Sequence, residues 1–329
     1  MKISFIIPVY NAAASIQGTL SSVLPYLEKG CEAVVINDGS VDESQQMIAH
    51  FAQEHQGVRL INQENRGQSA ARNEAIRQAT GDYIWCLDAD DWLTIDGMDE
   101  ILATAKQDRY DVIVIGRIEE YQGYNKRTPA LSRQEYPDGM DYFYNACQKD
   151  LFRTQPWNML VRRSLISSYQ VQFPEGRTFE DICWCIDVLR HAKATITLPV
   201  HPYHYQLANE NSLTKQVHMR DMDMLWIIHE AARLLDESDS KVTSDCPAFL
   251  TLIYWFVSSA IMKKYTPLYN NNHGAKQIVD SMIADQLFMR SVRYAATHYI
   301  GLRKSVLAFL LLISPILYRH VLALLLKRS

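Results

Sequence analysis

Two clusters of carboxylates in this sequence have residue types and spacing that suit chemistry. The first is Asp88-Ala89-Asp90-Asp91, which places three acids directly after an apolar run at residues 83–87. Their mutual repulsion requires a cation or hydrogen-bond donors nearby. Mg²⁺ or Mn²⁺ would meet this requirement, because hard divalent ions prefer oxygen ligands and usually keep substrate phosphates in their shell. The alternative is a helix-entry loop in which Asp90 or Asp91 caps the next segment.

The second cluster is Glu180-Asp181, which precedes an apolar, helical stretch at residues 182–189. The helix dipole stabilises acidic residues at a helix N-terminus. The pattern alone therefore favours a capping role for this pair.

Alternating strands and helices must position these acids. Apolar runs at residues 3–9, 33–36, 58–61, 83–87 and 112–115 predict buried β-strands. Between them, Ser40 to Glu43 has the signature of a capping box that opens one helix, and residues 69–79 predict another. This alternation predicts an α/β fold with a doubly wound, parallel sheet and right-handed crossovers.

Polar segments follow the first four predicted strands, at the edge where such sheets bind ligands. They are Pro8-Val9-Tyr10-Asn11, Asn37-Asp38-Gly39-Ser40, Asn65-Arg66-Gly67-Gln68 and the acids at 88–91. Polar residues commonly end strands, but four such segments at one edge indicate a binding site. The first loop lacks the glycine turn of a dinucleotide site, and no GxxxxGK[ST] motif occurs. An anion must therefore be held in another way.

The C-terminal region differs from the rest in charge. Residues 286–329 contain no Asp or Glu and seven basic residues: Arg290, Arg293, Arg303, Lys304, Arg319, Lys327 and Arg328. Aliphatic residues lie between them, which favours an anionic membrane surface over nucleic acid. The apolar run at 306–318 is too short to cross a bilayer, so we expect an interfacial helical pair, with a buried oligomer contact as the alternative.

Cysteine usage and the N-terminus bear on location. The six cysteines show no CxxC pairs, and the first apolar run stops without a cleavage pattern. We therefore expect reduced thiols in a cytoplasmic protein, bound peripherally to the inner face of the cell membrane.

Four motifs in residues 3–93 resemble the nucleotide-sugar domain of inverting family 2 glycosyltransferases with the GT-A fold. They are Ile6-Ile7-Pro8-Val9-Tyr10-Asn11, Ile36-Asn37-Asp38-Gly39-Ser40-Val41-Asp42, Asn65-Arg66-Gly67 through Ala71-Arg72-Asn73, and Leu87-Asp88-Ala89-Asp90-Asp91. The resemblance is weaker from residue 93 to about residue 215. It implies a GT-A domain at 1–215 with a nucleotide-binding half (1–100) and an acceptor half (101–215). A helical region (216–285) and the basic amphipathic tail (286–329) would follow.

The resemblance also implies roles on the donor side. Asp38 would accept a hydrogen bond from the nucleotide base, Arg72 would lie near the base or the diphosphate, and Asp88 would contact the ribose. The other predicted nucleotide-sugar-binding residues are Pro8, Tyr10, Asn11, Asn65 and Gly67. Uracil, thymine and guanine all offer a ring N–H to a carboxylate, so UDP is favoured only by family habit.

For the metal and the acceptor side, the resemblance implies that Asp90 coordinates Mg²⁺ or Mn²⁺ and that Asp181, beside Glu180, is the general base. His204 or His201 is a further candidate for the metal or the diphosphate, although a lone histidine is more often structural. Met159 and Gln206 stand where the family often carries a lysine and an arginine, so no cationic contact is expected there.

These inferences predict a metal-dependent, inverting transfer of a sugar from a nucleotide diphosphate to a hydroxyl. The acceptor would be a carbohydrate or a lipid-linked molecule, in cell-surface polysaccharide or glycolipid synthesis. A sugar-nucleotide nucleotidyltransferase is one alternative, but it would carry a glycine-rich basic loop after the first strand. A catalytically silent nucleotide-sugar or carbohydrate-binding module is another, and the complete acidic clusters count against it.

Overall fold

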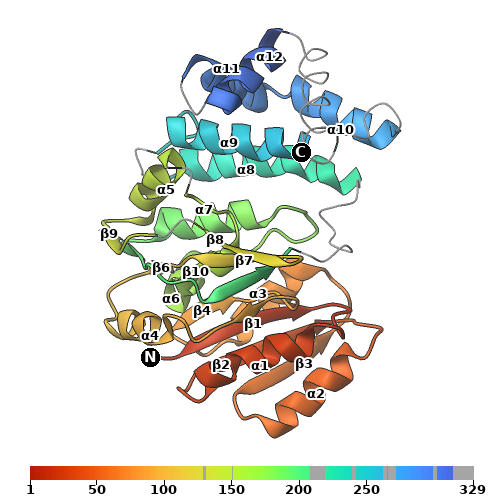
Figure 1. The fold of residues 1–329 in the computed structure, drawn as a ribbon, viewed down its shortest axis with the longest axis vertical. Helices are drawn as coiled ribbons and strands as arrows, with labels where there is room; N and C mark the ends of the chain where they lie inside the picture. The colour runs from red at the N-terminus through yellow and green to blue at the C-terminus, as the bar shows by residue number, and fades with distance from the viewer. Residues whose placement is uncertain are drawn as a thin grey trace. The chain divides into compact units, whose positions relative to one another are not determined.

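The computed structural model describes residues 1–128, 131–149, 151–207, 219–238, 242–261, 265, 272–298 and 302–313. The chain forms two compact units (Figure 1). The first comprises Met1–Tyr142 and Arg153–Asn209, and the second comprises Phe143–Phe152 and Glu210–Ser329. The finer division at residues 100, 215 and 285 stays a prediction.

The first unit alternates strands and helices as the sequence predicts. Its elements in chain order are β1 (Ile3–Val9), α1 (Ile16–Leu27), β2 (Glu32–Asp38), α2 (Ser44–Glu54), β3 (Val58–Gln63), α3 (Gln68–Gln78), β4 (Tyr83–Cys86), β5 (Trp92–Leu93), α4 (Met98–Lys106), β6 (Val112–Val114), β7 (Arg117–Tyr121), β8 (Tyr124–Arg127), β9 (Gln134–Tyr136), η1 (Pro156–Asn158), β10 (Met159–Arg162), α6 (Arg163–Tyr169), α7 (Asp181–His191), β11 (Thr195–Thr197) and β12 (Tyr203–Gln206). A further helix, α5 (Gly139–Gln148), contributes residues to both units.

Among the described residues, the main sheet has eight strands in the order β3-β2-β1-β4-β10-β6-β11-β9. The first four run parallel, and every residue of β1, β2 and β4 is buried. Strands covered on both faces need such continuous apolar runs. The sheet is not parallel throughout, because β10 pairs antiparallel with both β4 and β6. β10 follows the short helix η1 rather than a crossover helix, so it enters the sheet from the opposite end.

The strand order reverses beside β1. The chain passes from β1 to β2 and β3 on one side, then returns through α3 to β4 on the other side. Right-handed crossovers put α1 and α2 on one face and α3 on the other. Figure 1 shows α1 and α2 beside the strands β1 to β3, and α3 packs on β1 and β2. The crevice at such a reversal, outside the carboxyl ends of β1 and β4, is where doubly wound sheets bind ligands.

The predicted capping box at Ser40 to Glu43 does not form. α2 begins at Ser44, and its N-cap residue Glu43 makes no side-chain cap bond. The Ser44 backbone N–H donates to Asp42 Oδ1 at 3.0 Å, while the Ser40 hydroxyl accepts from the Asn11 backbone N–H at 3.0 Å. Ser40 is therefore used to join the first two loops rather than to cap the helix.

A second, four-stranded sheet has the order β5-β12-β7-β8. Its first strand, β5, begins directly after Asp91, and β12 pairs antiparallel with it so that His204 lies opposite Trp92. This sheet brings residues 203–206 to the acidic cluster at 88–91.

The second unit is helical. Its described elements are η3 (Met219–Met222), α8 (Asp223–Asp236), α9 (Pro247–Ala260), α10 (His273–Ala284), α11 (Gln286–Thr297) and α12 (Leu302–Ile313). α8, α9 and α10 lie within residues 216–285, the region that was expected to be helical. α11 packs on α9 and α12 through an apolar face that includes Leu287, Phe288 and Val292. None of the helices in the described ranges has the length and apolarity needed to cross a membrane.

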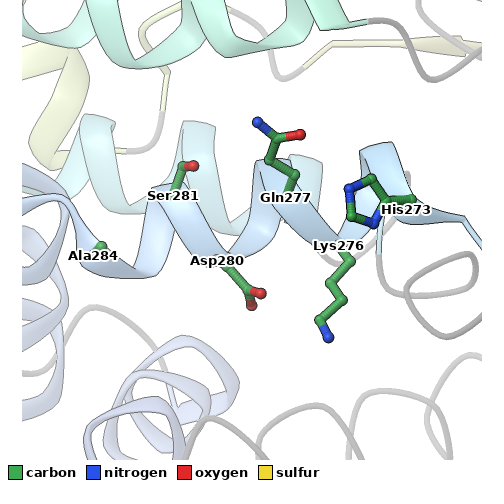
Figure 2. Close-up of a pocket in the computed structure, with 6 residues that line it drawn as sticks. All are labelled: His273, Lys276, Gln277, Asp280, Ser281 and Ala284. Atoms are coloured by element: carbon green, nitrogen blue, oxygen red, sulfur yellow. The ribbon is translucent and has the colours of Figure 1, made fainter.

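A hollow of about 400 Å³ lies beside α10 in the second unit (Figure 2). The described residues that line it come from α10: His273, Lys276, Gln277, Asp280, Ser281 and Ala284. None of the predicted site residues is among them.

Candidate active site

Arg72, on α3, brings the two acidic clusters together. Its side chain is only 1% exposed, and Nη2 donates to Asp88 Oδ1 at 2.8 Å. Nη1 donates to Asp181 Oδ1 at 2.8 Å and to Glu180 Oε1 at 3.3 Å. The rigid fork of a guanidinium suits such a bridge. The end of β4 and the start of α7 therefore meet at one cation.

Aromatic packing holds the guanidinium in place. Its central carbon lies 5.1 Å from the centre of the Phe173 ring, and that ring stacks on Trp184 with centres 4.6 Å apart and planes 5° apart. A cation over an aromatic face is attracted by the ring's electron density. A contact between Arg72 and a nucleotide or diphosphate stays a prediction.

Asp181 has the properties that a general base needs. Burial raises its pKa to about 8, against the opposing effect of Arg72, and the neighbouring Glu180 and Asp88 raise it further. About a quarter of the Asp181 side chain (26%) is exposed. Oδ1 is held by Arg72, whereas Oδ2 has no hydrogen-bond partner among the residues that the structure describes. This oxygen can take a proton from a bound hydroxyl.

Glu180 differs from Asp181 in accessibility. It is the N-cap residue of α7, yet its side chain makes no cap bond. Burial also raises its pKa, while Arg72 lowers it. The glutamate side chain is mostly buried, so it is the less accessible acid of the pair.

The three acids at 88–91 separate into different environments. Asp91 is buried, and its oxygens accept from the Tyr203 hydroxyl at 2.5 Å and from the Gln206 backbone N–H at 2.8 Å. Burial, with the charge of Asp88, raises the pKa of Asp91 well above its usual range. Asp91 therefore ties β12 to this loop rather than capping a following helix.

Asp90 is the acid of this cluster that is predicted to bind a metal. Asp88 faces Arg72 and Asp91 faces β12, while Asp90 lies half-buried in the turn between them. No group of three or more His, Cys, Asp or Glu side chains that could hold a metal occurs within the described ranges. One carboxylate together with the diphosphate oxygens of a substrate is a usual donor set for Mg²⁺, so this geometry fits the ion. Metal binding by Asp90 stays a prediction.

His204 is oriented by two contacts. Its ring stacks on Trp92 with centres 5.2 Å apart, and Nδ1 lies 2.7 Å from Glu120 Oε1. A carboxylate at Nδ1 leaves Nε2 as the basic nitrogen, as in many metal-binding histidines. His201, the other candidate, is buried, with Nε2 3.2 Å from the Thr128 carbonyl. The burial and backbone contact of His201 favour a structural role, and metal binding by His204 stays a prediction.

Asp38, the predicted partner of the nucleotide base, organises the loop before α3. Its Oδ1 accepts from the Gln63 amide at 2.7 Å and from the Arg66 backbone N–H at 2.9 Å, and its Oδ2 accepts from the Gly67 N–H at 2.8 Å. The carboxylate thus supports the turn at 66–67. A carboxylate has about four acceptor sites, so a base N–H would use the one left at Oδ2.

The other predicted donor residues lie on loops that are joined to one another. A Cβ at Gly39, whose φ is +71°, would lie 2.8 Å from the Asn65 backbone nitrogen, so only glycine permits this approach. Asn11 has a φ of +50°, and its Oδ1 accepts from the Val41 N–H at 2.8 Å. The first, second and third loops therefore form one connected edge.

Pro8, Tyr10 and Gly67 complete the set predicted for the donor. Pro8 is buried in β1, whereas the Tyr10 side chain just beyond it is 52% exposed. Gly67 has a φ of +87° and is the N-cap residue of α3. Of these residues, Tyr10 offers the largest accessible surface to a ligand.

The structure describes the surroundings of Met159 and Gln206, the two positions that depart from the family pattern. Met159 is buried as the first residue of β10, opposite Val114, so a cation there would be desolvated. At Gln206 the backbone N–H, rather than a charged side chain, contacts Asp91.

Sequence reasoning missed four residues that shape this site. Tyr203 and Glu120 orient Asp91 and His204, and Asn73 and Glu175 hold the loop that leads to Asp181. Asn73 belongs to the family motif that ends in Ala71-Arg72-Asn73, and this membership could have marked it as a site residue. No local sequence pattern identifies Tyr203, Glu120 or Glu175, because their partners lie far away in sequence.

Comparisons with known proteins identify the family of this chain. The model of the family described as Glycosyl transferase family 2 matches residues 4–169. EpsH of Bacillus subtilis (strain 168) is 29% identical over 209 residues, which are 62% of this chain and 60% of EpsH. The chain thus spans about three fifths of the length of this curated relative.

Solved structures with the same fold exist at low sequence identity. The 1–349 fragment of S. aureus TarS in complex with UDP-GlcNAc has a TM-score of 0.74 and 18% identity, over 100% of this chain and 93% of that one. The mannosyltransferase PcManGT from Pyrobaculum calidifontis, in complex with GDP-Man and Mn²⁺, has a TM-score of 0.54 and 16% identity, over 98% of this chain and 86% of that one.

Proposed function

Because this chain belongs to glycosyl transferase family 2 and has the GT-A fold, we propose that it transfers a sugar from a nucleoside diphosphate to an acceptor hydroxyl with inversion at the anomeric carbon. The observation that carries the proposal is the bridge made by Arg72. It joins Asp88, in the loop predicted to bind the donor, to Asp181, the acid whose raised pKa suits a general base.

The donor is proposed to be a UDP-sugar. Its base would lie against Asp38 and the loops at 8–11 and 65–67, and Asp88 would accept from the ribose. The TarS complex contains UDP-GlcNAc and the PcManGT complex contains GDP-Man, so both nucleotides occur on this fold. Uracil and guanine each offer a ring N–H to a carboxylate, which makes the choice an experimental one.

Asp90 would hold Mg²⁺ or Mn²⁺ together with the diphosphate, and His204 is a further candidate ligand. When bound, the metal neutralises the charge that develops on the departing diphosphate. The PcManGT complex, which contains Mn²⁺, supports the use of a divalent ion on this fold.

Inversion would follow from a single in-line displacement. Asp181 Oδ2 takes the proton of the acceptor hydroxyl while Arg72 keeps Oδ1 in place. Arg72 also binds Asp88. The general base Asp181 and the loop that holds the donor therefore keep a constant spacing. Water is the simplest acceptor that this arrangement would activate. Hydrolysis of the donor can therefore be assayed before the natural acceptor is known.

Thermal stability with candidate donors tests the proposed function. UDP-sugars with Mn²⁺ are expected to raise the melting temperature, because a ligand that binds only the folded state stabilises it. The panel should include UDP-GlcNAc, UDP-glucose and GDP-mannose, and the same donors with EDTA serve as controls. A UDP-sugar that stabilises should also release UDP on incubation. If no nucleotide sugar stabilises the protein or is hydrolysed, the proposal is wrong.

The acceptor is proposed to be a carbohydrate or a lipid-linked molecule at an anionic membrane surface. Part of the predicted tail, residues 314–329, lies outside the described residues. Within the described part, α11 buries its apolar face, so removal of everything after Gln286 would expose α9. α12 instead presents Val306 (48% exposed) and Phe309 (54% exposed) on its surface.

Val306→Glu combined with Phe309→Glu is expected to release the protein from anionic vesicles. Apolar burial and attraction to anionic lipid act together in interfacial helices, and the two glutamates oppose both. Sedimentation with vesicles of phosphatidylglycerol and phosphatidylcholine measures the effect. Gln277→Glu with Ser281→Glu adds the same charge on α10 and should leave binding unchanged. Equal binding by the wild type and the α12 variant would show that α12 is not the membrane contact.

A further inference from the structure

We infer that Asn73 is a positioning residue for Asp181: it holds the far end of the loop at 173–181 and thereby sets where the carboxylate points. The inference rests on the proposed role of Asp181 as the general base. Asn73 would touch neither substrate, and its effect on turnover would pass entirely through that acid.

The side-chain amide of Asn73 clamps one residue of the loop from both sides. It is 3% exposed, and its Nδ2 donates to the Phe173 carbonyl at 2.9 Å. Its Oδ1 accepts from the Phe173 backbone N–H, also at 2.9 Å. The two bonds copy the pairing of a β-strand, and only an amide offers one donor and one acceptor in this arrangement.

The clamp extends one step further along the loop. Asn73 Nδ2 lies 3.3 Å from Glu175 Oε1, and Glu175 Oε2 accepts from the Arg66 guanidinium at 3.0 Å. Arg66 belongs to the turn that Asp38 supports. Because the ion pair is exposed, it contributes little, and the buried amide carries the attachment.

Consecutive residues of α3 hold the two ends of the same loop. Asn73 binds Phe173 at its beginning, and Arg72 binds Asp181 at its end. The ring of Phe173 also covers the Arg72 guanidinium. A displaced Phe173 would therefore disturb both the loop and the cation that orients the base.

The backbone between these ends is strained. Phe179 has a φ of +64°, a left-handed conformation that bulky residues rarely adopt, and it directly precedes Glu180-Asp181. Such a conformation persists only where surrounding contacts enforce it. With the Phe173 end released, Phe179 would relax and the direction of the first turn of α7 would change. The clamp is thus a condition for the placement of Asp181.

Asn73→Asp tests the inference with a side chain of the same shape. The carboxylate still accepts from the Phe173 N–H but cannot donate to its carbonyl. We expect kcat for UDP release from the UDP-sugar selected in the thermal screen to fall by about 10²-fold, the cost of a misplaced catalytic group. The affinity for UDP with Mn²⁺, measured by calorimetry, should stay within about twofold of the wild type, because Asp38 holds the turn at 66–67 through backbone hydrogen bonds and the exposed Arg66–Glu175 ion pair contributes little to it.

The same substitution in an Asp181→Asn background provides the readout that a general structural role would not change. If Asn73 acts through Asp181, the double variant should be no slower than Asp181→Asn alone. Asn73→Ser is a second variant if the aspartate prevents folding. Gln78→Ala is the matched control, because it removes an exposed amide that bonds to Glu74 on the same helix.

The outcomes separate this inference from the proposed function. Normal turnover by Asn73→Asp, or a loss that persists in full in the Asp181→Asn background, would overturn the role of Asn73 only. Normal turnover by Asp181→Asn alone would instead remove the base assignment on which the inference depends.

Discussion

Asp181→Asn is expected to lower kcat by about 10²-fold or more while leaving the affinity for UDP with Mn²⁺ nearly unchanged. The amide keeps the shape of the carboxylate and one oxygen near Arg72, but it cannot take a proton from the acceptor. In the wild type, one oxygen is held by Arg72 and the other is available to the hydroxyl. Steady-state rates of UDP release with the selected UDP-sugar measure the loss.

The pH profile provides a second measurement on the same acid. Burial raises the pKa of Asp181 to about 8, and the base must be deprotonated to act. kcat/KM should therefore rise with pH, and activity should be lost as the pH falls through this raised pKa. The acid limb would lie well above the usual range for an aspartate and should disappear in Asp181→Asn. A limb that remains in that variant would belong to another group.

Glu180→Gln is the matched control. The glutamate shares the same cation and is mostly buried, so it has less access to an acceptor. We expect a smaller loss of kcat than for Asp181→Asn. The reverse order would assign the base to Glu180, and a product with retained anomeric configuration, read from NMR coupling constants, would refute the single displacement itself.

Asp90→Ala is expected to remove most of the activity, with turnover reduced by about 10²-fold or more, because metal compensation of the leaving diphosphate supplies several kcal/mol in such reactions. In the wild type, EDTA should abolish turnover and added Mn²⁺ should restore it. The assignment to Asp90 rests on its place in the family motif Leu87-Asp88-Ala89-Asp90-Asp91, at the carboxyl end of β4.

Binding of UDP with and without Mn²⁺ gives a readout independent of turnover. Asp90→Ala should weaken the affinity for UDP only when Mn²⁺ is present. Asp96→Ala removes an exposed carboxylate from the same region and should change neither quantity. Full turnover in EDTA, or an unchanged gain in UDP affinity from Mn²⁺ in Asp90→Ala, would exclude metal binding at this position.

The parts of the protein that follow from local pattern could be predicted from the sequence. β1 and β2 are buried on both faces, and the apolar runs within them, at 3–9 and 33–36, can be recognised without a structure. The crossover rule then places the loops after β2 and β4 at the same edge, and this is why Asp38 and Asp88 were expected at one site. The family pattern in residues 3–93 added their roles.

The capping box and the tail show where local pattern was insufficient. Ser40 has the spacing of a helix cap, but a distant backbone group, the Asn11 N–H, uses its hydroxyl. α11 has the basic, amphipathic sequence expected of a membrane helix, yet α9 and α12 bury its apolar face. In both cases a partner from another segment decided the outcome.

The relation between the two acidic clusters depended on tertiary structure alone. No local signal connects Asp88 with Asp181, because Arg72 joins them only after α3, β4 and α7 have packed together. The raised pKa of Asp181 likewise reflects burial by distant segments. The sequence determined which strands form and at which edge the polar residues gather, because those properties depend on neighbours along the chain. Tertiary structure decided that Asp88 binds Arg72, that Asp91 binds β12 and that Asp181 keeps one oxygen available for a proton. It did so because burial and hydrogen bonding depend on neighbours in space.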